Sequence, residues 1–206
     1  MATIVPHALT TLVRIKSRLN IPTTNFDDLL TELINAATDY IESACGGRRF
    51  KETPYVYEIY SGGPDRRSYV VLRNYPVTVL ASLEFRAGMQ SNPNWTAFVL
   101  DTFELVEDGK LGLIRIYGGL PRGTNNIRAS YTAGYKIDFT QEGTVNHTLP
   151  FDLSDLCERL TIRFFKKRES HGKEQEHGSD SRVMWRAAME PEDIATLERY
   201  ARPYLA

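Results

Sequence analysis

Apolar residues recur at helical spacing in two segments near the start of the chain. Residues 8–19 carry an apolar stripe on one side, which predicts a helix. This helix should end before Pro22, because a residue that precedes a proline is disfavoured in the helical conformation. A longer stripe over residues 29–44 predicts a second helix, which we expect to begin at an N-cap, Asn25, and to stop at Gly46 and its glycine neighbour.

The two predicted helices differ in charge. The charged residues of the first helix are all basic, whereas the polar side of the second carries only acidic ones, and two arginines follow it directly. Opposite charges attract, so we expect these residues to pair within the chain or with a neighbouring subunit. The candidate subunit-interface residues are Arg14, Arg18, Asp28, Glu32, Asp39, Glu42, Arg48 and Arg49.

In the middle of the chain, apolar positions alternate with a period of two, which is typical of strands. Turn-forming residues such as Gly62 and Asn74 separate the strand-like segments. Six or seven short strands with tight turns predict a small antiparallel barrel or sandwich. The expected strands cover residues 55–60, 68–73, 77–85, 97–100, 103–105, 111–117 and 127–131.

Tyrosines are concentrated in the first predicted hairpin, at positions 55, 57, 60 and 69. Aromatic side chains pack well on a half-buried sheet, which is one interpretation. Tyrosine is also enriched at contact surfaces between proteins, so an aromatic interface is the other.

Helical spacing returns after Pro150 and predicts a third helix that ends near Arg168. A polar stretch over residues 166–182 follows, and an apolar triplet at 183–185 interrupts it. The triplet has no local core, so it either folds back on the body of the protein or docks on a partner. A last short helix is predicted from Pro191, with an apolar stripe made of Ile194, Leu197 and Tyr200.

This order of elements predicts an α+β protein with a discontinuous helical bundle. Residues 1–53 and 149–168 should form the bundle from two N-terminal helices and the helix that follows the strands. Residues 54–148 should form the inserted antiparallel barrel or sandwich. Residues 169–206 should form a charged linker and a C-terminal arm that ends in the short helix.

Composition narrows the class of protein without naming a function. The chain has 206 residues, of which 42% are hydrophobic and 25% are charged, as in ordinary globular proteins. Its 25 basic and 26 acidic residues give a net charge of -1, which provides no general attraction to nucleic acid. No apolar run reaches the roughly 20 residues that cross a bilayer. We expect no signal peptide, because Pro6 interrupts the opening residues and no basic residue precedes it.

Two cysteines, Cys45 and Cys157, lie among apolar residues of predicted helices. We expect reduced core thiols, because a disulfide scaffold uses more cysteines. A catalytic thiol is the alternative, although no histidine is near either residue in the sequence. The N-x-T triplets at Asn94 and Asn146 are interpreted as chance matches, because no signal peptide is expected.

Motifs for catalysis or metal binding are few. The sequence contains no phosphate-binding loop, no nucleophile elbow and no histidine pair at helical zinc spacing. His171 and His177 belong to the polar stretch, where solvation is a simpler explanation than a metal. Paired carboxylates could serve a small hydrolase, but hairpin ends are often acidic because they face water. The acidic hairpin consists of Asp101, Glu104, Glu107 and Asp108. We therefore expect no catalytic, cofactor-binding or metal-binding residue, and no cofactor.

Several stretches of the chain have a recognisable order. The first is the opening helix pair over residues 28–42, closed by Arg48-Arg49-Phe50. The second reads Leu-Arg-Asn-Tyr-Pro-Val at 72–77, and the third ends in Tyr-Thr-Ala-Gly-Tyr at 131–135. Leu-Pro-Phe-Asp-Leu at 149–153 is the fourth, and residues 197–203 read as a closing helix. Together these stretches resemble the head–tail connector (adaptor) proteins of long-tailed bacteriophages and gene transfer agents.

The resemblance implies a structural role without catalysis. Such adaptors form an oligomeric ring, usually of twelve subunits, beneath the capsid portal. The ring extends the DNA channel, through which DNA passes without sequence recognition, and it offers a platform for a stopper or tail terminator. The implied partners are other copies of the chain, the portal protein and that next tail component, with no membrane. The implied location is the virion neck, after synthesis in the host cytoplasm.

Within this reading, we expect the C-terminal arm to dock on the portal. The portal-docking candidates are Met184, Trp185, Ile194, Leu197 and Tyr200. One alternative is a minor tail or tail-terminator protein, which shares the structural class and differs only in its partner. The other is a small hydrolase that uses the acidic hairpin.

Overall fold

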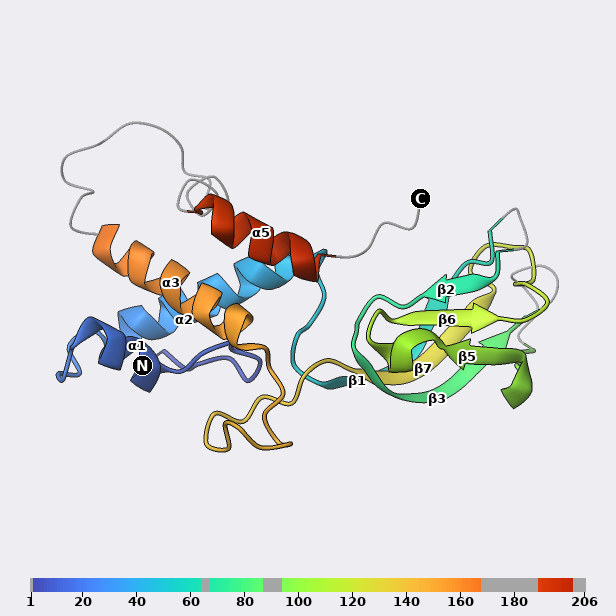
Figure 1. Cartoon of the computed structure of the whole chain (residues 1–206), viewed down its shortest axis with the longest axis horizontal. Helices are drawn as coiled ribbons and strands as arrows, with labels where there is room; N and C mark the ends of the chain where they lie inside the picture. Colours follow the sequence, from blue (N-terminus) through green and yellow to red (C-terminus); the bar gives the residue numbers. More distant parts are fainter. Residues whose placement is uncertain (1, 64–66, 87–93, 168–188, 202–206) are drawn as a thin grey trace. The chain divides into compact units, whose positions relative to one another are not determined.

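The computed structural model describes residues 2–63, 67–86, 94–167 and 189–201, and its chain divides into two compact units (Figure 1). The helical unit consists of Met1–Arg48 and Lys136–Ala206. The β unit consists of Arg49–Tyr135. The helical unit is thus discontinuous in sequence, and the β unit is inserted into it.

The described part of the helical unit contains four α-helices, so the four predicted helices are confirmed. In Figure 1, α3 crosses α2, and α5 runs beside α3; α1 contacts both α2 and α3. The bounds are Leu12–Leu19 for α1, Asp27–Ala44 for α2, Phe151–Lys167 for α3 and Pro191–Tyr200 for α5. Among the residues that the structure describes, none of the helices has the length and apolar character needed to cross a bilayer.

The first two helices begin later than expected. Helix α1 begins after Thr11, whose hydroxyl oxygen accepts a hydrogen bond from the Arg14 amide at 3.4 Å. The predicted N-cap Asn25 is wrong: the N-cap of α2 is Phe26, which makes no side-chain capping bond. The Phe26 ring packs edge-on against Phe165 of α3, with ring centroids 5.4 Å apart. Burial of this ring therefore accompanies the start of α2 in place of a polar cap.

The apolar stripes of the helices meet in one helical core. Leu9 is fully buried although it lies outside α1, so the predicted stripe begins before the helix does. Large buried side chains also come from α1, α2, α3 and α5, and from Leu149, two residues before α3. They include Ile15, Leu30, Ile34, Ile41, Leu149, Leu153, Leu156, Leu160 and Phe165.

The described part of the β unit contains seven strands in two antiparallel sheets, which agrees with the prediction of six or seven. The larger sheet has the order β1-β7-β3-β4, and the smaller has the order β2-β6-β5. The predicted strand over 97–100 ends at residue 97, and a 3-10 turn, η1 (Leu100–Thr102), follows. The strands are β1 (Thr53–Tyr60), β2 (Tyr69–Val71), β3 (Val77–Phe85), β4 (Thr96–Ala97), β5 (Phe103–Leu105), β6 (Leu113–Ile116) and β7 (Ile127–Ala133).

Both sheets contribute to one core. Leu83 and Tyr131 from the larger sheet belong to the same buried cluster as Val70 and Ile114 from the smaller one. Strand β7 shows the expected alternation, with every second side chain buried. The described strands do not close into a barrel, so that alternative of the prediction is wrong and two packed sheets replace it.

The chain enters and leaves the β unit through neighbouring segments. The Glu52 amide donates to the Tyr135 carbonyl at 2.8 Å, and the Tyr135 amide donates to the Phe50 carbonyl at 2.6 Å. Gly134 stands at this crossing with a φ of 115°. A Cβ at that position would meet the Lys51 carbonyl carbon at 2.6 Å, so only glycine fits the close approach.

Both cysteines are buried and free of disulfides, which confirms the prediction of core thiols. Burial raises the pKa of Cys45 to about 11 and that of Cys157 to about 12. The thiolate is the reactive form, so both thiols stay protonated and unreactive near pH 8. We expect Ellman's reagent at pH 8 to modify neither cysteine in the native protein and both in denaturant. Rapid modification of the native protein would contradict this.

Candidate functional site

A buried carboxylate holds α5 on α3. The Asp193 side chain is 0% exposed, and it faces Arg159 Nη2 at 3.0 Å and the Arg163 guanidinium. The same carboxylate accepts a hydrogen bond from the Glu190 amide at 3.0 Å, at the start of α5. One charged group therefore both caps α5 and attaches it to α3.

The other end of α5 is also attached within the helical unit. The Tyr200 hydroxyl donates to Asp152 Oδ1 at 2.7 Å, and Arg199 Nη1 lies 2.9 Å from Asp152 Oδ2. The buried Arg48 guanidinium donates through Nη1 to the Tyr200 carbonyl at 2.9 Å. Arg48, predicted as an interface residue, thus contacts α5 of its own chain.

These contacts place the predicted portal-docking residues. Leu197 is 7% exposed and packs inside the unit, and Tyr200 is bound to Asp152. Ile194 is 44% exposed and faces solvent. Met184 and Trp185 lie outside the described residues. Of the docking candidates that the structure describes, Ile194 is the one whose side chain is exposed.

The acidic candidates of α2 divide by burial. Asp28, Glu32 and Asp39 are exposed, whereas Glu42 is buried. Asp28, Glu32 and Asp39 are here called the acidic side of α2, and they are the acidic interface candidates that solvent reaches.

Residues 2–9 form an N-terminal segment beside α2, with a turn at Pro6 and His7 that the Ala8 amide closes on the Val5 carbonyl at 3.0 Å. Its backbone is bound at three points by side chains of α2. Asp28 Oδ1 accepts from the Ala2 amide at 2.8 Å, Asn35 Oδ1 from the Val5 amide at 3.0 Å, and Thr38 Oγ1 from the Leu9 amide at 3.3 Å. The segment is therefore held against the helix on both sides of His7.

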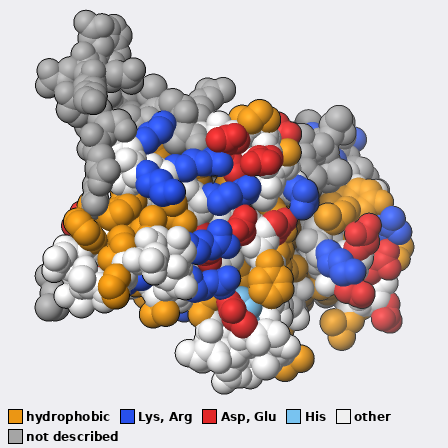
Figure 2. All heavy atoms as spheres, turned by 60° about the vertical axis from the view of Figure 1, so that its left-hand side comes forward, with side chains coloured by type: hydrophobic (Ala, Val, Ile, Leu, Met, Phe, Trp, Pro, Cys, Tyr) orange, Lys and Arg blue, Asp and Glu red, His pale blue; other side chains and the backbone are white. Residues whose placement is uncertain are grey.

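The basic residues of α1 pair chiefly with α3, and the sequence analysis did not foresee this. Glu158 of α3 is 0% exposed; its Oε1 lies 2.8 Å from Arg14 Nε and its Oε2 lies 2.6 Å from Arg18 Nε. Between α1 and α2, Lys16 Nζ lies 2.7 Å from Asp27 Oδ1. Figure 2 shows the resulting surface of the helical unit, where basic and acidic side chains interleave. Arg49, the last basic candidate, is exposed at the start of the β unit.

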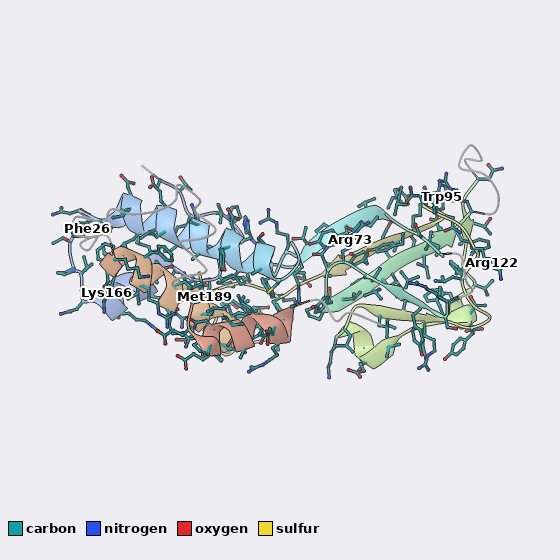
Figure 3. All side chains as sticks on the ribbon, turned by 90° about the horizontal axis from the view of Figure 1, so that it is seen from above. Phe26, Arg73, Trp95, Arg122, Lys166 and Met189 are labelled. Atoms are coloured by element: carbon teal, nitrogen blue, oxygen red, sulfur yellow. The ribbon has the colours of Figure 1, made fainter. Side chains whose placement is uncertain are left out.

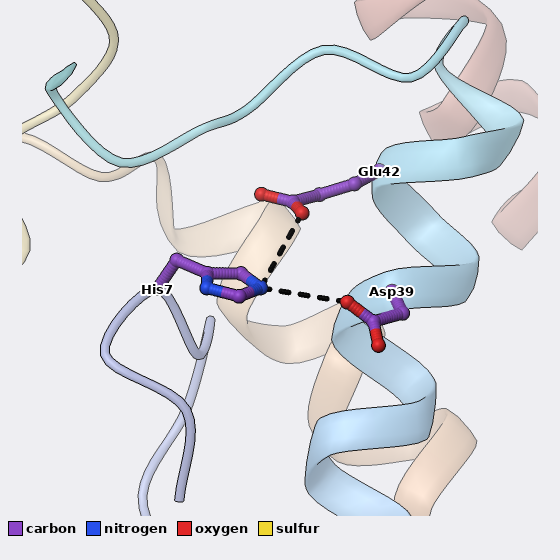
Figure 4. A group of neighbouring side chains, drawn as sticks. All are labelled: His7, Asp39 and Glu42. Atoms are coloured by element: carbon purple, nitrogen blue, oxygen red, sulfur yellow. Dashed lines mark hydrogen bonds and ion pairs between the residues drawn. The ribbon is translucent and has the colours of Figure 1, made fainter. Parts of the chain in front are cut away.

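One group of side chains, which the sequence analysis missed, brings a histidine to two carboxylates (Figure 4). His7 Nε2 lies 3.4 Å from Asp39 Oδ1 and 3.6 Å from Glu42 Oε2. The three ligand-type atoms all lie within 4.8 Å of one another. The two carboxylates are spaced i, i+3 on α2, which places them on the same side of the helix. That spacing was the available signal, but nothing in the sequence connects it to His7.

The acidic hairpin lies in solvent, as the simpler interpretation predicts. All four carboxylate residues are exposed. Glu104 Oε1 faces Arg115 Nη1 at 3.1 Å. Glu107 and Asp108 lie in the turn η2 (Val106–Gly109), both with positive φ. The described geometry therefore gives this group the features of a surface turn.

Arginine and aromatic side chains stack on the β unit. The Arg128 guanidinium lies 4.2 Å from the Tyr57 ring centroid and 4.5 Å from that of Trp95, which Figure 3 labels. Arg86 also faces Trp95, at 5.0 Å. The packing interpretation of the tyrosine-rich hairpin is confirmed for Tyr55 and Tyr60, and an aromatic interface stays a prediction for the exposed tyrosines. Tyr57 and Tyr69 are exposed, whereas positions 55 and 60 pack against the core.

The comparisons with known proteins agree with the resemblance found in the sequence. Residues 9–70 match a family model described as phage gp6-like head-tail connector protein. The matched region includes α1, α2 and β1. A comparison with curated proteins gives no match. A connector of this kind is a structural protein of the bacteriophage virion, with a place at the head–tail interface. Over residues 9–70, this chain is therefore similar to the phage gp6-like head–tail connector family.

Proposed function

We propose that this protein is the structural adaptor between the capsid portal and the tail. Copies of the chain form a ring, of twelve subunits, that extends the DNA channel and carries the next tail component. The observation that carries this proposal is the family match over residues 9–70. The net charge of -1 supports it, because a strongly basic channel would bind the phosphates of passing DNA too firmly.

A closed ring needs two different faces that meet, one from each neighbour. We assign one face to the acidic side of α2. The other face uses Arg18 of the helical unit, which stays partly exposed while it pairs with Asp155 and Glu158. Arg49, the exposed basic candidate of the β unit, is a separate contact. Arg14, Glu42 and Arg48 were also candidates, but they are bound or buried within their own unit, so we do not assign them to either face.

Portal docking is assigned to the region that precedes and includes α5, with Met184, Trp185 and Ile194 as contacts. The attachment of α5 at both ends supports this assignment, because it provides a fixed anchor on the adaptor. The Tyr40 hydroxyl adds a contact to Met189 Sδ at 3.2 Å, just before α5.

The test of the proposed function is the molar mass of the purified protein by light scattering, alone and mixed with its portal. A ring-sized species, or a monomer that joins the portal in a fixed multiple, is the expected result. A monomer that ignores the portal would overturn the proposal.

Replacing Met184 and Trp185 together by alanine should weaken portal binding at least tenfold. Buried aromatic anchors contribute a large share of interface energy, typically about 2 kcal/mol or more each. The matched control is Val13→Ala, which trims an exposed apolar side chain of α1 and should leave portal binding unchanged. Surface plasmon resonance on immobilised portal would measure both, and equal affinities for the double variant and the parent would refute the docking assignment.

A further inference from the structure

We propose that His7, Asp39 and Glu42 bind a divalent transition-metal ion, with Zn²⁺ as the best match, and that the ion fastens the N-terminal segment to α2. The three side chains converge in Figure 4, where the imidazole Nε2 faces both carboxylates. This role goes beyond the adaptor function and does not depend on it.

The two distances from His7 Nε2 to the carboxylate oxygens fit a tetrahedral ion, and the third side of the triangle is at most 4.8 Å. Zinc bonds to nitrogen and oxygen are about 2.0–2.1 Å long, which places two ligand atoms of a tetrahedron about 3.4 Å apart. His7 Nε2 lies 3.4 Å from Asp39 Oδ1 and 3.6 Å from Glu42 Oε2. An ion can therefore be placed at bonding distance from all three ligands with sub-ångström movements of the side chains.

The imidazole is hydrogen-bonded to Asp39 and lies within ion-pair distance of both carboxylates, and the same geometry suits a metal ion. A ring nitrogen carries at most one proton, so Nε2 can donate one good hydrogen bond at about 2.7–3.2 Å. Here two carboxylate oxygens approach the same nitrogen, and both lie beyond that range. A metal ion accepts lone pairs from all three atoms at once. The nitrogen and the two oxygens form a triangle that can surround such an ion.

The ligands are held before any ion binds. The Val5 and Leu9 amides, on either side of His7, donate to side chains of α2, as described above. Asp39 and Glu42 project from consecutive turns of the same helix. Preorganised ligands lose little conformational entropy on binding, which raises the affinity of a site.

The ligand types select the class of ion. An imidazole nitrogen with two carboxylates suits zinc and its first-row neighbours, whereas Ca²⁺ takes six to eight oxygen ligands and Mg²⁺ retains its waters. The Glu42 side chain is 5% exposed and the Asp39 side chain is 64% exposed. The site is therefore buried on the Glu42 side and open to solvent on the Asp39 side. Water can enter from the open side as the fourth ligand.

The experiment is isothermal titration calorimetry of the full chain with ZnCl2 after removal of metal by EDTA, paired with thermal unfolding. One zinc ion per chain and a rise of the unfolding temperature with zinc are expected. The variant His7→Gln should bind zinc at least tenfold more weakly. Asp39→Asn, at an exposed position, should do the same without a risk to the fold. Mg²⁺ at millimolar concentration should not compete.

The matched control replaces the histidines of the polar stretch, His171→Gln with His177→Gln, and should keep the site intact. Two outcomes would overturn the proposal. One is the absence of stoichiometric zinc binding by the parent protein. The other is zinc binding that survives His7→Gln but disappears in the control, because that would identify an adventitious ion on the other histidines.

Discussion

Replacing Glu158 by alanine should lower the free energy of unfolding of the helical unit by about 3 kcal/mol, since removing one partner of a buried ion pair costs about 3–5 kcal/mol. The carboxylate is fully buried between α1 and α3. It faces the guanidinium groups of Arg14 and Arg18 and accepts a hydrogen bond from Thr10 Oγ1 at 2.9 Å. The expected value lies at the lower end of the range because both arginines reach solvent and keep second carboxylate partners.

The measurement is thermal unfolding followed by far-UV circular dichroism, where 3 kcal/mol corresponds to a loss of roughly 6–12 °C for a chain of this size. The matched control is Asp155→Ala, on the same helix and on the same arginine, Arg18, but partly exposed. Exposed pairs contribute about 0–1 kcal/mol, so the control should change little. Equal losses for the two variants would show that burial of Glu158 does not set its contribution.

Replacing Gly134 by alanine should destabilise the β unit by about 2–4 kcal/mol, because two costs act together. A φ of 115° lies in a region that other residues occupy only with strain, at about 1–3 kcal/mol. The new Cβ would also lie 2.6 Å from the Lys51 carbonyl carbon and 2.7 Å from the Glu52 amide nitrogen. These are backbone atoms and cannot swing aside, so the two crossing segments must separate.

The control for this prediction is Gly143→Ala in the loop before α3. Gly143 also has a positive φ, of 80°, but no atom lies within 4 Å of an added Cβ. Its cost should therefore stay near the 1–2 kcal/mol of left-handed backbone strain. Urea unfolding of both variants separates the clash from the strain, and a Gly134 variant no weaker than the control would disprove the steric argument.

The sequence predicts the elements of this fold well because periodicity is a local property. The stripe over 29–44 becomes α2, and the alternation over 127–131 becomes β7, the strand that pairs with both β1 and β3. Element ends were less predictable. The start of α2 depends on the contact of Phe26 with Phe165, and a partner so distant in the sequence leaves no mark on the residues around 26.

The partners of charged residues at the candidate interface could not be predicted either, because they too depend on contacts between distant parts of the sequence. A row of basic residues predicts a basic helix, but it does not identify the partner. Arg14 and Arg18 pair with Glu158 on α3, and Arg48 donates to the Tyr200 carbonyl. These contacts form only when the helical unit is folded. His7 meets α2 for the same reason, because the path of the N-terminal segment depends on backbone bonds to Asn35 and Thr38.

The hydrogen-bonded segments at Phe50, Glu52 and Tyr135, where the chain enters and leaves the β unit, affect how such proteins can diverge in evolution. The two ends of the inserted β unit are hydrogen-bonded to each other. The fold of the helical unit therefore requires only that the chain leave and return at this point, whatever lies between. Chain-closure entropy grows slowly with length, by about 0.6 kcal/mol per doubling, so insertions and deletions beyond the junction cost the helical core little. Recombination with breakpoints at this junction would exchange a complete β unit between phages, and the two halves of a connector could then evolve at different rates.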